Sequence, residues 1–248
     1  MKNKVYHHIE ANAAKGKKQY CLLIDPDKYN AKQVEECIFI ANNAKVDLIF
    51  VGGSLLTQNR AQDCVRLIKE LTAIPVVLFP GSPAQICEEA DALLFLSLIS
   101  GRNADLLIGR HVEAAPFLKK SGLEVIPTGY MLIDGGRATT VSYISNTIPI
   151  PADKPDIAAC TALAGEMLGL KLIYMDSGSG AAYPIPPANI ELVKNTISTP
   201  LIVGGGIHTK QQMLDACTAG ADVIVVGNAI EKDRELIYTF ADVLQGFN

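Results

Sequence analysis

The sequence predicts an α/β fold, a single (β/α)8 barrel (TIM barrel) domain of residues 1–248 that is modified around its third helix. Three observations predict it. The chain has 248 residues, close to the ~250 of a typical barrel. Strand-like and helix-like segments alternate along it, as parallel βαβ units require. Glycine clusters follow the last two strand-like runs, at residues 204–206 and 227, where such barrels carry a phosphate site.

The strands are predicted from short runs of β-branched and other apolar residues. Continuous apolar runs are typical of parallel strands that are buried on both faces. In chain order the predicted strands cover residues 20–24, 47–51, 76–79, 92–96, 124–126, 172–175, 201–203 and 223–226. Eight strands favour a closed barrel over an open sheet.

Helices are predicted from amphipathic stretches between these strands, at residues 32–43, 61–71, 105–121, 157–168, 189–196, 210–219 and 231–244. The third helix is the exception, because residues 83–90 make barely two turns. We expect a short helix or a loop there. The irregular segment 130–153 is longer than usual βα connections, which predicts a functional loop or lid on the active face.

Composition excludes several classes of protein. The net charge is −4 without a basic stripe, so we expect no nucleic-acid partner. The longest apolar run, residues 92–100, is far shorter than the ~20 residues that span a bilayer. Residues 1–5 lead into a polar segment without the apolar region of a secretory signal. The six cysteines form no CxxC pair and are expected to be reduced, mostly buried thiols of a cytoplasmic protein.

Polar residues follow the first two predicted strands. Asp25 stands where a carboxylate can hold Mg2+ or act as a base, although it could also belong to a helix-capping turn. Asp27 fits a helix N-cap better, and Lys28 is expected to be solvated rather than catalytic. After the second strand, Gly53 and Ser54 form either a plain turn or a turn that admits a ligand, with the Ser54 hydroxyl on a metal.

The loop after the sixth strand is rich in hydroxyl groups and glycine, with one carboxylate, Asp176, that could accept a substrate proton. This composition suits a polyol phosphate. The apolar residues after the fourth strand, 95–99, are either ordinary packing or the wall for an apolar substrate tail.

Missing residues narrow the chemistry. Apart from Lys28, no lysine at a strand end could form a Schiff base. The fifth strand ends at residues 127–130 without the second acid that isomerases of phosphoribosyl intermediates use. No GxGxxG follows the first strand. Another phosphate-binding barrel enzyme, either an isomerase or a synthase, and a non-catalytic phosphometabolite-binding protein remain alternatives.

Taken together, the linked motifs resemble the geranylgeranylglyceryl phosphate synthases, a family that also includes heptaprenylglyceryl phosphate synthases. The motifs lie at residues 22–28, 51–54, 130–141, 174–181, 204–207 and 226–230, in the family's order over essentially the whole chain. The resemblance implies a Mg2+-dependent prenyltransferase. It would join the 3-hydroxyl of sn-glycerol 1-phosphate to a long-chain prenyl diphosphate, expected to be geranylgeranyl diphosphate, and release diphosphate. It also implies a homo-oligomer and peripheral association with membranes through the lipid product.

The resemblance also assigns roles to residues. Asp25 and Ser54 would bind Mg2+, and Asp176 and Tyr130 would be catalytic, with Tyr130 gating the prenyl channel. Glycerol phosphate would be bound by Tyr174, Met175, Asp176, Ser177, Gly178, Ser179, Gly180, Gly205, Gly206, Gly227 and Asn228. Asp176 stands where the family usually has Glu, so the charge is kept on a side chain shorter by one methylene.

Overall fold

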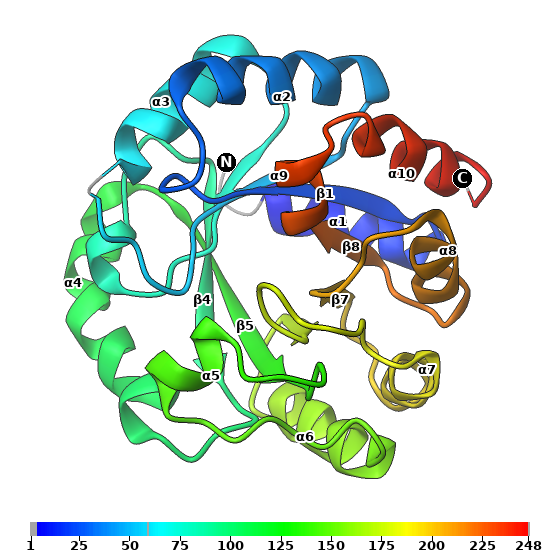
Figure 1. Ribbon diagram of the computed structural model, residues 1–248. Coiled ribbons are helices and arrows are strands. Elements are labelled where there is room, and N and C mark those ends of the chain that lie inside the picture. The colour runs from blue at the N-terminus through cyan, green and yellow to red at the C-terminus, as the bar shows by residue number, and fades with distance from the viewer. Residues whose placement is uncertain (1–3, 59, 248) are drawn as a thin grey trace.

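Eight parallel strands, neighbours in chain order, close into one barrel in the computed structural model, which describes residues 4–58 and 60–247 (Figure 1). The strands are β1 (Gln19–Ile24), β2 (Leu48–Val51), β3 (Val76–Leu78), β4 (Ala92–Leu98), β5 (Glu124–Leu132), β6 (Leu172–Asp176), β7 (Leu201–Gly204) and β8 (Val223–Val226). The predicted fold class and the positions of all eight strands along the chain are confirmed.

Helices surround the barrel, with the predicted modification after β3. The outer helices are α2 (Ala31–Ala44), α3 (Ala61–Leu71), α4 (Arg110–Ser121), α6 (Pro155–Met167), α7 (Pro187–Thr196), α8 (Lys210–Thr218) and α10 (Leu236–Gln245). After β3 the chain forms only the short 3-10 helix η1 (Pro83–Gln85). A π-helical turn, η2 (Asp105–Gly109), precedes α4. Short helices α5 (Thr140–Ser145) and α9 (Asn228–Lys232) follow β5 and β8.

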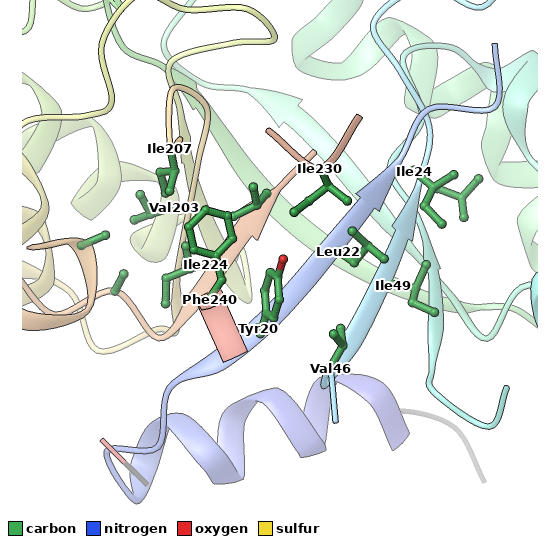
Figure 2. Close-up of a cluster of buried hydrophobic side chains, with 14 of the residues drawn as sticks. Tyr20, Leu22, Ile24, Val46, Ile49, Val203, Ile207, Ile224, Ile230 and Phe240 are labelled. Atoms are coloured by element: carbon green, nitrogen blue, oxygen red, sulfur yellow. The ribbon is translucent and has the colours of Figure 1, made fainter. Parts of the chain in front are cut away.

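The strand side chains divide between two hydrophobic clusters, because successive residues of a strand face opposite sides. In the outer cluster, Leu22, Ile49 and Ile224 pack between the strands and the helices (Figure 2). The Phe240 ring of α10 lies edge-on to Tyr20 there, with 6.3 Å between ring centroids. The inner cluster fills the barrel with residues such as Phe50, Tyr130 and Tyr174.

An N-terminal helix, α1 (Lys4–Ala14), closes the amino end of the barrel. Its Val5 and Ile9 are buried with the inner cluster. The backbone N–H groups of Val5 and Tyr6 each donate to a carboxylate oxygen of Glu124, at 2.8 Å. Glu124 therefore satisfies N–H groups that have no partner within the helix. The sequence predicted only a polar segment here. The prediction of a missing secretory signal also rested on residues 1–3, which lie outside the described residues.

Several predictions of element bounds were wrong. Strand β5 runs to Leu132 instead of ending at residue 126, so Tyr130 belongs to a strand and not to the irregular segment. A Cβ on Gly129 would lie 2.8 Å from Ile99 Cδ1, so this glycine allows close packing within a strand. The single helix predicted at residues 231–244 is two helices, α9 and α10. The segment 130–153 contains α5.

The structure also bears on the predictions made from the cysteines and from the apolar runs. The cysteines are free thiols, all buried except Cys160, as predicted. Within residues 4–58 and 60–247, none of the helices combines the length and the apolar character needed to cross a membrane.

Candidate active site

A cavity lined by charged and hydroxyl side chains, here called the polar cavity, opens at the carboxyl ends of β1, β2, β6, β7 and β8. Residues predicted from widely separated motifs meet in its wall, because the carboxyl ends of parallel strands share one face of a barrel. The predicted site residues that line it are Asp25, Ser54, Tyr174, Asp176, Ser179, Gly205, Gly206, Gly227 and Asn228.

The other predicted site residues do not line this cavity. The Met175 side chain is fully buried in the outer cluster, so it faces the helices and not the mouth. Ser177, Gly178 and Gly180 shape the loop after β6 from behind: the backbone N–H of Ser177 donates to the Gly204 carbonyl at 3.2 Å, and Gly178 and Gly180 have positive φ. Tyr130 lies in the barrel interior, next to a second cavity.

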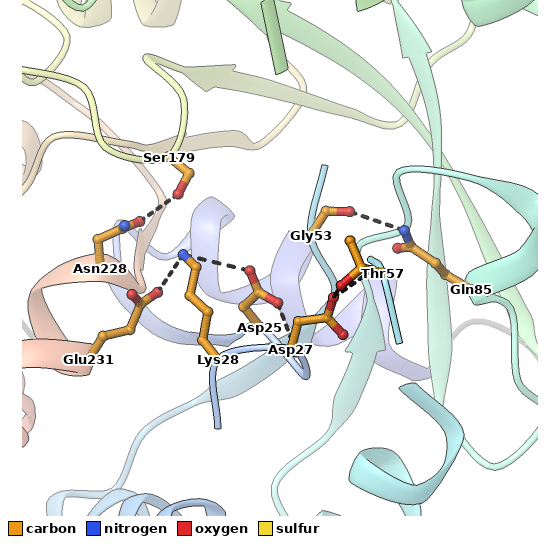
Figure 3. Close-up of polar contacts among 9 residues, drawn as sticks. All are labelled: Asp25, Asp27, Lys28, Gly53, Thr57, Gln85, Ser179, Asn228 and Glu231. Atoms are coloured by element: carbon orange, nitrogen blue, oxygen red, sulfur yellow. Dashed lines mark hydrogen bonds and ion pairs between the residues drawn. The ribbon is translucent and has the colours of Figure 1, made fainter. Parts of the chain in front are cut away.

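The glycines after β7 are required by their backbone. Gly205 and Gly206 have φ of +80° and +69°, a region that side chains disfavour. A Cβ on Gly205 would also lie 2.5 Å from Asp176 Oδ1. Across the mouth, the Ser179 hydroxyl donates to Asn228 Oδ1 at 2.9 Å and so links the loops after β6 and β8 (Figure 3). Without side chains in the way, a phosphate can approach the backbone N–H groups of these loops.

Asp25 projects into the polar cavity beside a cation. Its Oδ1 accepts a hydrogen bond from the Asp27 N–H at 3.1 Å, and its Oδ2 lies 3.6 Å from Lys28 Nζ. Burial raises the pKa of Asp25, although the Asp27 N–H and the Lys28 charge oppose that rise. Lys28 was expected to be solvated, but its ammonium also pairs with Glu231 at 2.9 Å across the cavity wall (Figure 3).

Asp27 holds a neighbouring loop and does not cap a helix. Its Oδ2 accepts a hydrogen bond from the Thr57 hydroxyl at 3.0 Å (Figure 3). The same oxygen accepts a hydrogen bond from the Gln58 N–H at 3.3 Å. The N-cap of α2 is Asn30, which forms a capping box with Gln33. The expectation that Asp27 caps the helix was therefore wrong.

The carboxylate of Asp176 is buried between two donors. The Tyr130 hydroxyl donates to Oδ2 and the Gly178 N–H donates to Oδ1, both at 2.7 Å. Burial raises the pKa of Asp176, and these two hydrogen bonds oppose that rise. An ionised carboxylate has about four acceptor positions, so Asp176 can still accept a hydrogen bond from a ligand hydroxyl. The link to Tyr130 could not be read from the sequence, because it depends on the register of β5 and β6.

Aromatic rings form the floor between the cavity and the barrel core. The Phe79 ring stacks on Tyr174 with centroids 5.1 Å apart, and Tyr130 meets Tyr174 edge-on at 5.4 Å. Burial raises the pKa of both tyrosine hydroxyls well above the usual value. Both therefore stay protonated, and Tyr130 acts as a hydrogen-bond donor.

A second cavity lies beside η1 and is lined mainly by apolar residues. Its wall includes Phe95, Leu96 and Leu98 of β4, as well as residues of η2, α4 and α5. Helix α5 lies at both cavities, since Thr140 lines the polar one and Val141 the apolar one. The residues shared by the two cavities are Gly53, Ser54 and Phe79, so the cavities adjoin there.

One amide side chain that the sequence did not single out fixes this border. Gln85 of η1 donates from Nε2 to the Gly53 carbonyl at 3.1 Å (Figure 3) and accepts from the Gly81 N–H at 2.9 Å. It therefore ties the loop after β2 to the loop after β3.

Comparison with known proteins assigns the family. The sequence profile described as the PcrB family matches residues 13–244. The chain belongs to the PcrB family. Two curated relatives are geranylgeranylglyceryl phosphate synthases. The one from Chitinophaga pinensis is 57% identical over 98% of this chain and 97% of its own. The one from Pyrococcus abyssi is 41% identical over 94% of this chain and 92% of its own. The family resemblance seen in the motifs is thus confirmed.

Solved structures give a second comparison for this PcrB chain, at the level of the fold. A crystal structure of (S)-3-O-geranylgeranylglyceryl phosphate synthase from Thermoplasma acidophilum, in complex with its substrate sn-glycerol-1-phosphate, matches with a TM-score of 0.93. The two chains are 31% identical and each is covered to 99%. An N-acetylmannosamine-6-phosphate 2-epimerase from Clostridium perfringens shares only the fold, at 12% identity and a TM-score of 0.58.

Proposed function

We propose that this protein is a Mg2+-dependent prenyltransferase that joins the 3-hydroxyl of sn-glycerol 1-phosphate to geranylgeranyl diphosphate, forming an ether and releasing diphosphate. A curated relative at 57% identity carries the name geranylgeranylglyceryl phosphate synthase. The closely similar Thermoplasma acidophilum structure contains sn-glycerol-1-phosphate. Homo-oligomerisation and association with membranes through the product lipid remain predictions.

The observation that carries the proposal is the junction of the two cavities. The reaction joins a small polar phosphate ester to a long hydrocarbon, so its site needs one polar and one apolar compartment with the reacting atoms at their border. A polar cavity edged by the Gly205 and Gly227 loops adjoins an apolar one at Gly53, Ser54 and Phe79. An isomerase acting on a small sugar phosphate has no use for the apolar compartment.

The donor set of the polar cavity fits Mg2+. This ion binds through one or two carboxylates, with water and substrate phosphates completing its coordination. Asp25 and Ser54 offer one carboxylate and one hydroxyl on the same wall. Among the described residues, no cluster of three or more His, Cys, Asp or Glu side chains offers an alternative metal site. When bound there, Mg2+ would neutralise the diphosphate and make it a better leaving group.

The remaining chemistry falls to the protein's own residues. Asp176 would accept a hydrogen bond from the 3-hydroxyl of glycerol phosphate and take its proton as the new C–O bond forms. The raised pKa of Asp176 makes its ionised form a stronger base than a solvent-exposed aspartate. Tyr130 holds the carboxylate in place through its 2.7 Å hydrogen bond. The apolar cavity would hold the prenyl chain.

A turnover assay with mass-spectrometric detection of the lipid product tests the proposal. We expect an ether product from Mg2+, geranylgeranyl diphosphate and sn-glycerol 1-phosphate, and none from the 3-phosphate enantiomer. Asp25→Asn should abolish Mg2+-dependent turnover and leave glycerol phosphate binding largely intact, because Asp25 belongs to the metal side of the cavity.

Two outcomes would contradict the proposal. Glycerol phosphate binding without turnover, with shorter and longer prenyl donors also tried, would favour a non-catalytic binding protein. Unchanged turnover of the Asp25→Asn variant would remove Asp25 from the metal site.

A further inference from the structure

Lys28 supplies the positive charge of a cavity that otherwise presents carboxylates. Among the described residues that line the polar cavity, it contributes the one lysine or arginine side chain, whereas Asp25, Asp176 and Glu231 contribute carboxylates. The site proposed above must hold a phosphate ester and a diphosphate at once. Because like charges repel, the cation has to face the phosphates when both are bound.

The contacts of Lys28 divide into a close one and a loose one. Its Nζ lies 2.9 Å from Glu231 Oε1 but 3.6 Å from Asp25 Oδ2, outside hydrogen-bond distance (Figure 3). The Lys28 side chain is 37% exposed, and ion pairs at this exposure are weak. The ammonium can therefore leave Asp25 at little cost while it stays on Glu231.

Glu231 is positioned to serve as the pivot. It belongs to α9, and its backbone N–H donates to the Gly227 carbonyl at 3.2 Å. This bond fixes Glu231 to the same loop that carries Gly227 and Asn228 at the cavity mouth. Rotation of the Lys28 side chain about this contact would keep its ammonium beside the loop that carries Gly227.

We propose that Lys28 is an exchangeable counter-ion of the metal–diphosphate site. Before the donor binds, its ammonium neutralises Asp25. When Asp25 takes up the metal, Lys28 turns on Glu231 and donates to a diphosphate oxygen. This inference rests on the proposed function and adds to it a diphosphate-binding residue. No covalent bond changes in the exchange.

Binding measurements without turnover test the exchange. Lys28→Met retains the apolar stem and removes the charge, and Lys28→Arg keeps the charge. Lys232→Met is the matched control, since Lys232 follows Glu231 on α9 but is not among the residues of the cavity wall. Titration calorimetry would measure the affinity for Mn2+ alone and for inorganic pyrophosphate with Mg2+. Thermal unfolding would establish that each variant is folded.

The expected results move in opposite directions. Lys28→Met should bind Mn2+ a few-fold more tightly, because a competing cation is gone, and bind Mg2+–pyrophosphate roughly tenfold more weakly. Lys28→Arg should restore pyrophosphate binding, and Lys232→Met should match the wild type in both titrations.

Other outcomes separate the two levels of the hypothesis. Suppose that the wild type binds both Mn2+ and Mg2+–pyrophosphate. If Lys28→Met then binds both with unchanged affinity, or binds both more weakly, the role of Lys28 is overturned and the proposed function still stands. A wild-type protein that binds neither Mn2+ nor Mg2+–pyrophosphate would contradict the proposed function, and the inference with it.

Discussion

The two ends of the barrel use their buried carboxylates in opposite ways. At the amino end, Glu124 accepts two helix N–H groups at 2.8 Å, and α1 covers the opening. At the carboxyl end, burial raises the pKa of both Asp25 and Asp176. The buried hydroxyl of Ser177 also lacks a hydrogen-bond partner among the described residues.

This difference separates stability from chemistry. A carboxylate that caps a helix stabilises the fold, since its charge meets the positive end of the helix dipole. A carboxylate whose pKa is raised by burial is costly to ionise, and that cost makes it a useful base. Variants at the two ends should therefore divide cleanly between loss of turnover and loss of stability.

The largest effect is expected from Asp176→Asn. Turnover should fall roughly a thousandfold, because an amide cannot take the substrate proton. The melting temperature at pH 7 should be unchanged or higher. Since the folded-state pKa of Asp176 is raised, its stabilising contribution is present below the unfolded pKa and is lost as the pH rises through the folded pKa.

Steady-state assays and thermal unfolding at pH 7 and in acid would measure both effects. Any gain in melting temperature should shrink as the pH falls through the folded pKa. Turnover within a few-fold of the wild type would show that Asp176 is not the base. The contrast between the carboxylates at the two ends of the barrel would then not hold.

A smaller effect on turnover is expected from Tyr130→Phe, which sharpens the comparison. The Tyr130 hydrogen bond lowers the pKa of Asp176 against the effect of burial. Its loss should raise that pKa further, so the acid limb of the kcat profile should move to higher pH. We expect kcat at neutral pH to fall roughly tenfold. An unmoved acid limb would mean that Tyr130 does not act through Asp176.

The smallest effect on turnover is expected at the amino end, from Glu124→Gln. One carboxylate oxygen becomes an amide NH2 that faces a helix N–H, which should cost about 1–3 kcal/mol in the free energy of unfolding. Urea unfolding would measure this loss, and assays well below the melting temperature should show unchanged kcat. A fall in kcat of the folded variant would show that the two ends are coupled.

The sequence was most informative where a residue's role follows from its place on a single strand. Apolar runs marked all eight strands. Asp25 and Asp176 stand at the ends of their own strands, a position that does not depend on which strands lie next to them. The glycine clusters were readable for a related reason, since a left-handed backbone at Gly205 and Gly206 requires that residue type.

Contacts between distant segments could not be read in the same way. Helix α1 was missed because only Val5 and Ile9 of its residues are buried, too few for a clear apolar stripe. Strand β5 was cut short because Pro127 and Gly129 usually interrupt strands. The Tyr130–Asp176 contact depends on the register between β5 and β6. The Lys28–Glu231 contact depends on the pairing of β1 with β8, which closes the barrel.

The hydrogen bonds of Gln85 separate the part of the site at the border of the two cavities from the far wall of the apolar cavity. Because this one side chain fixes the Gly53 and Gly81 loops, the border where the substrates would react is set independently of the far wall of the apolar cavity. We therefore expect substitutions on η2 or α4 to reshape the apolar cavity, which is proposed to hold the prenyl chain, without moving Asp25 or Asp176. On this proposal, the length of the accepted hydrocarbon could change, by evolution or by engineering, while the bond-forming residues stay in place.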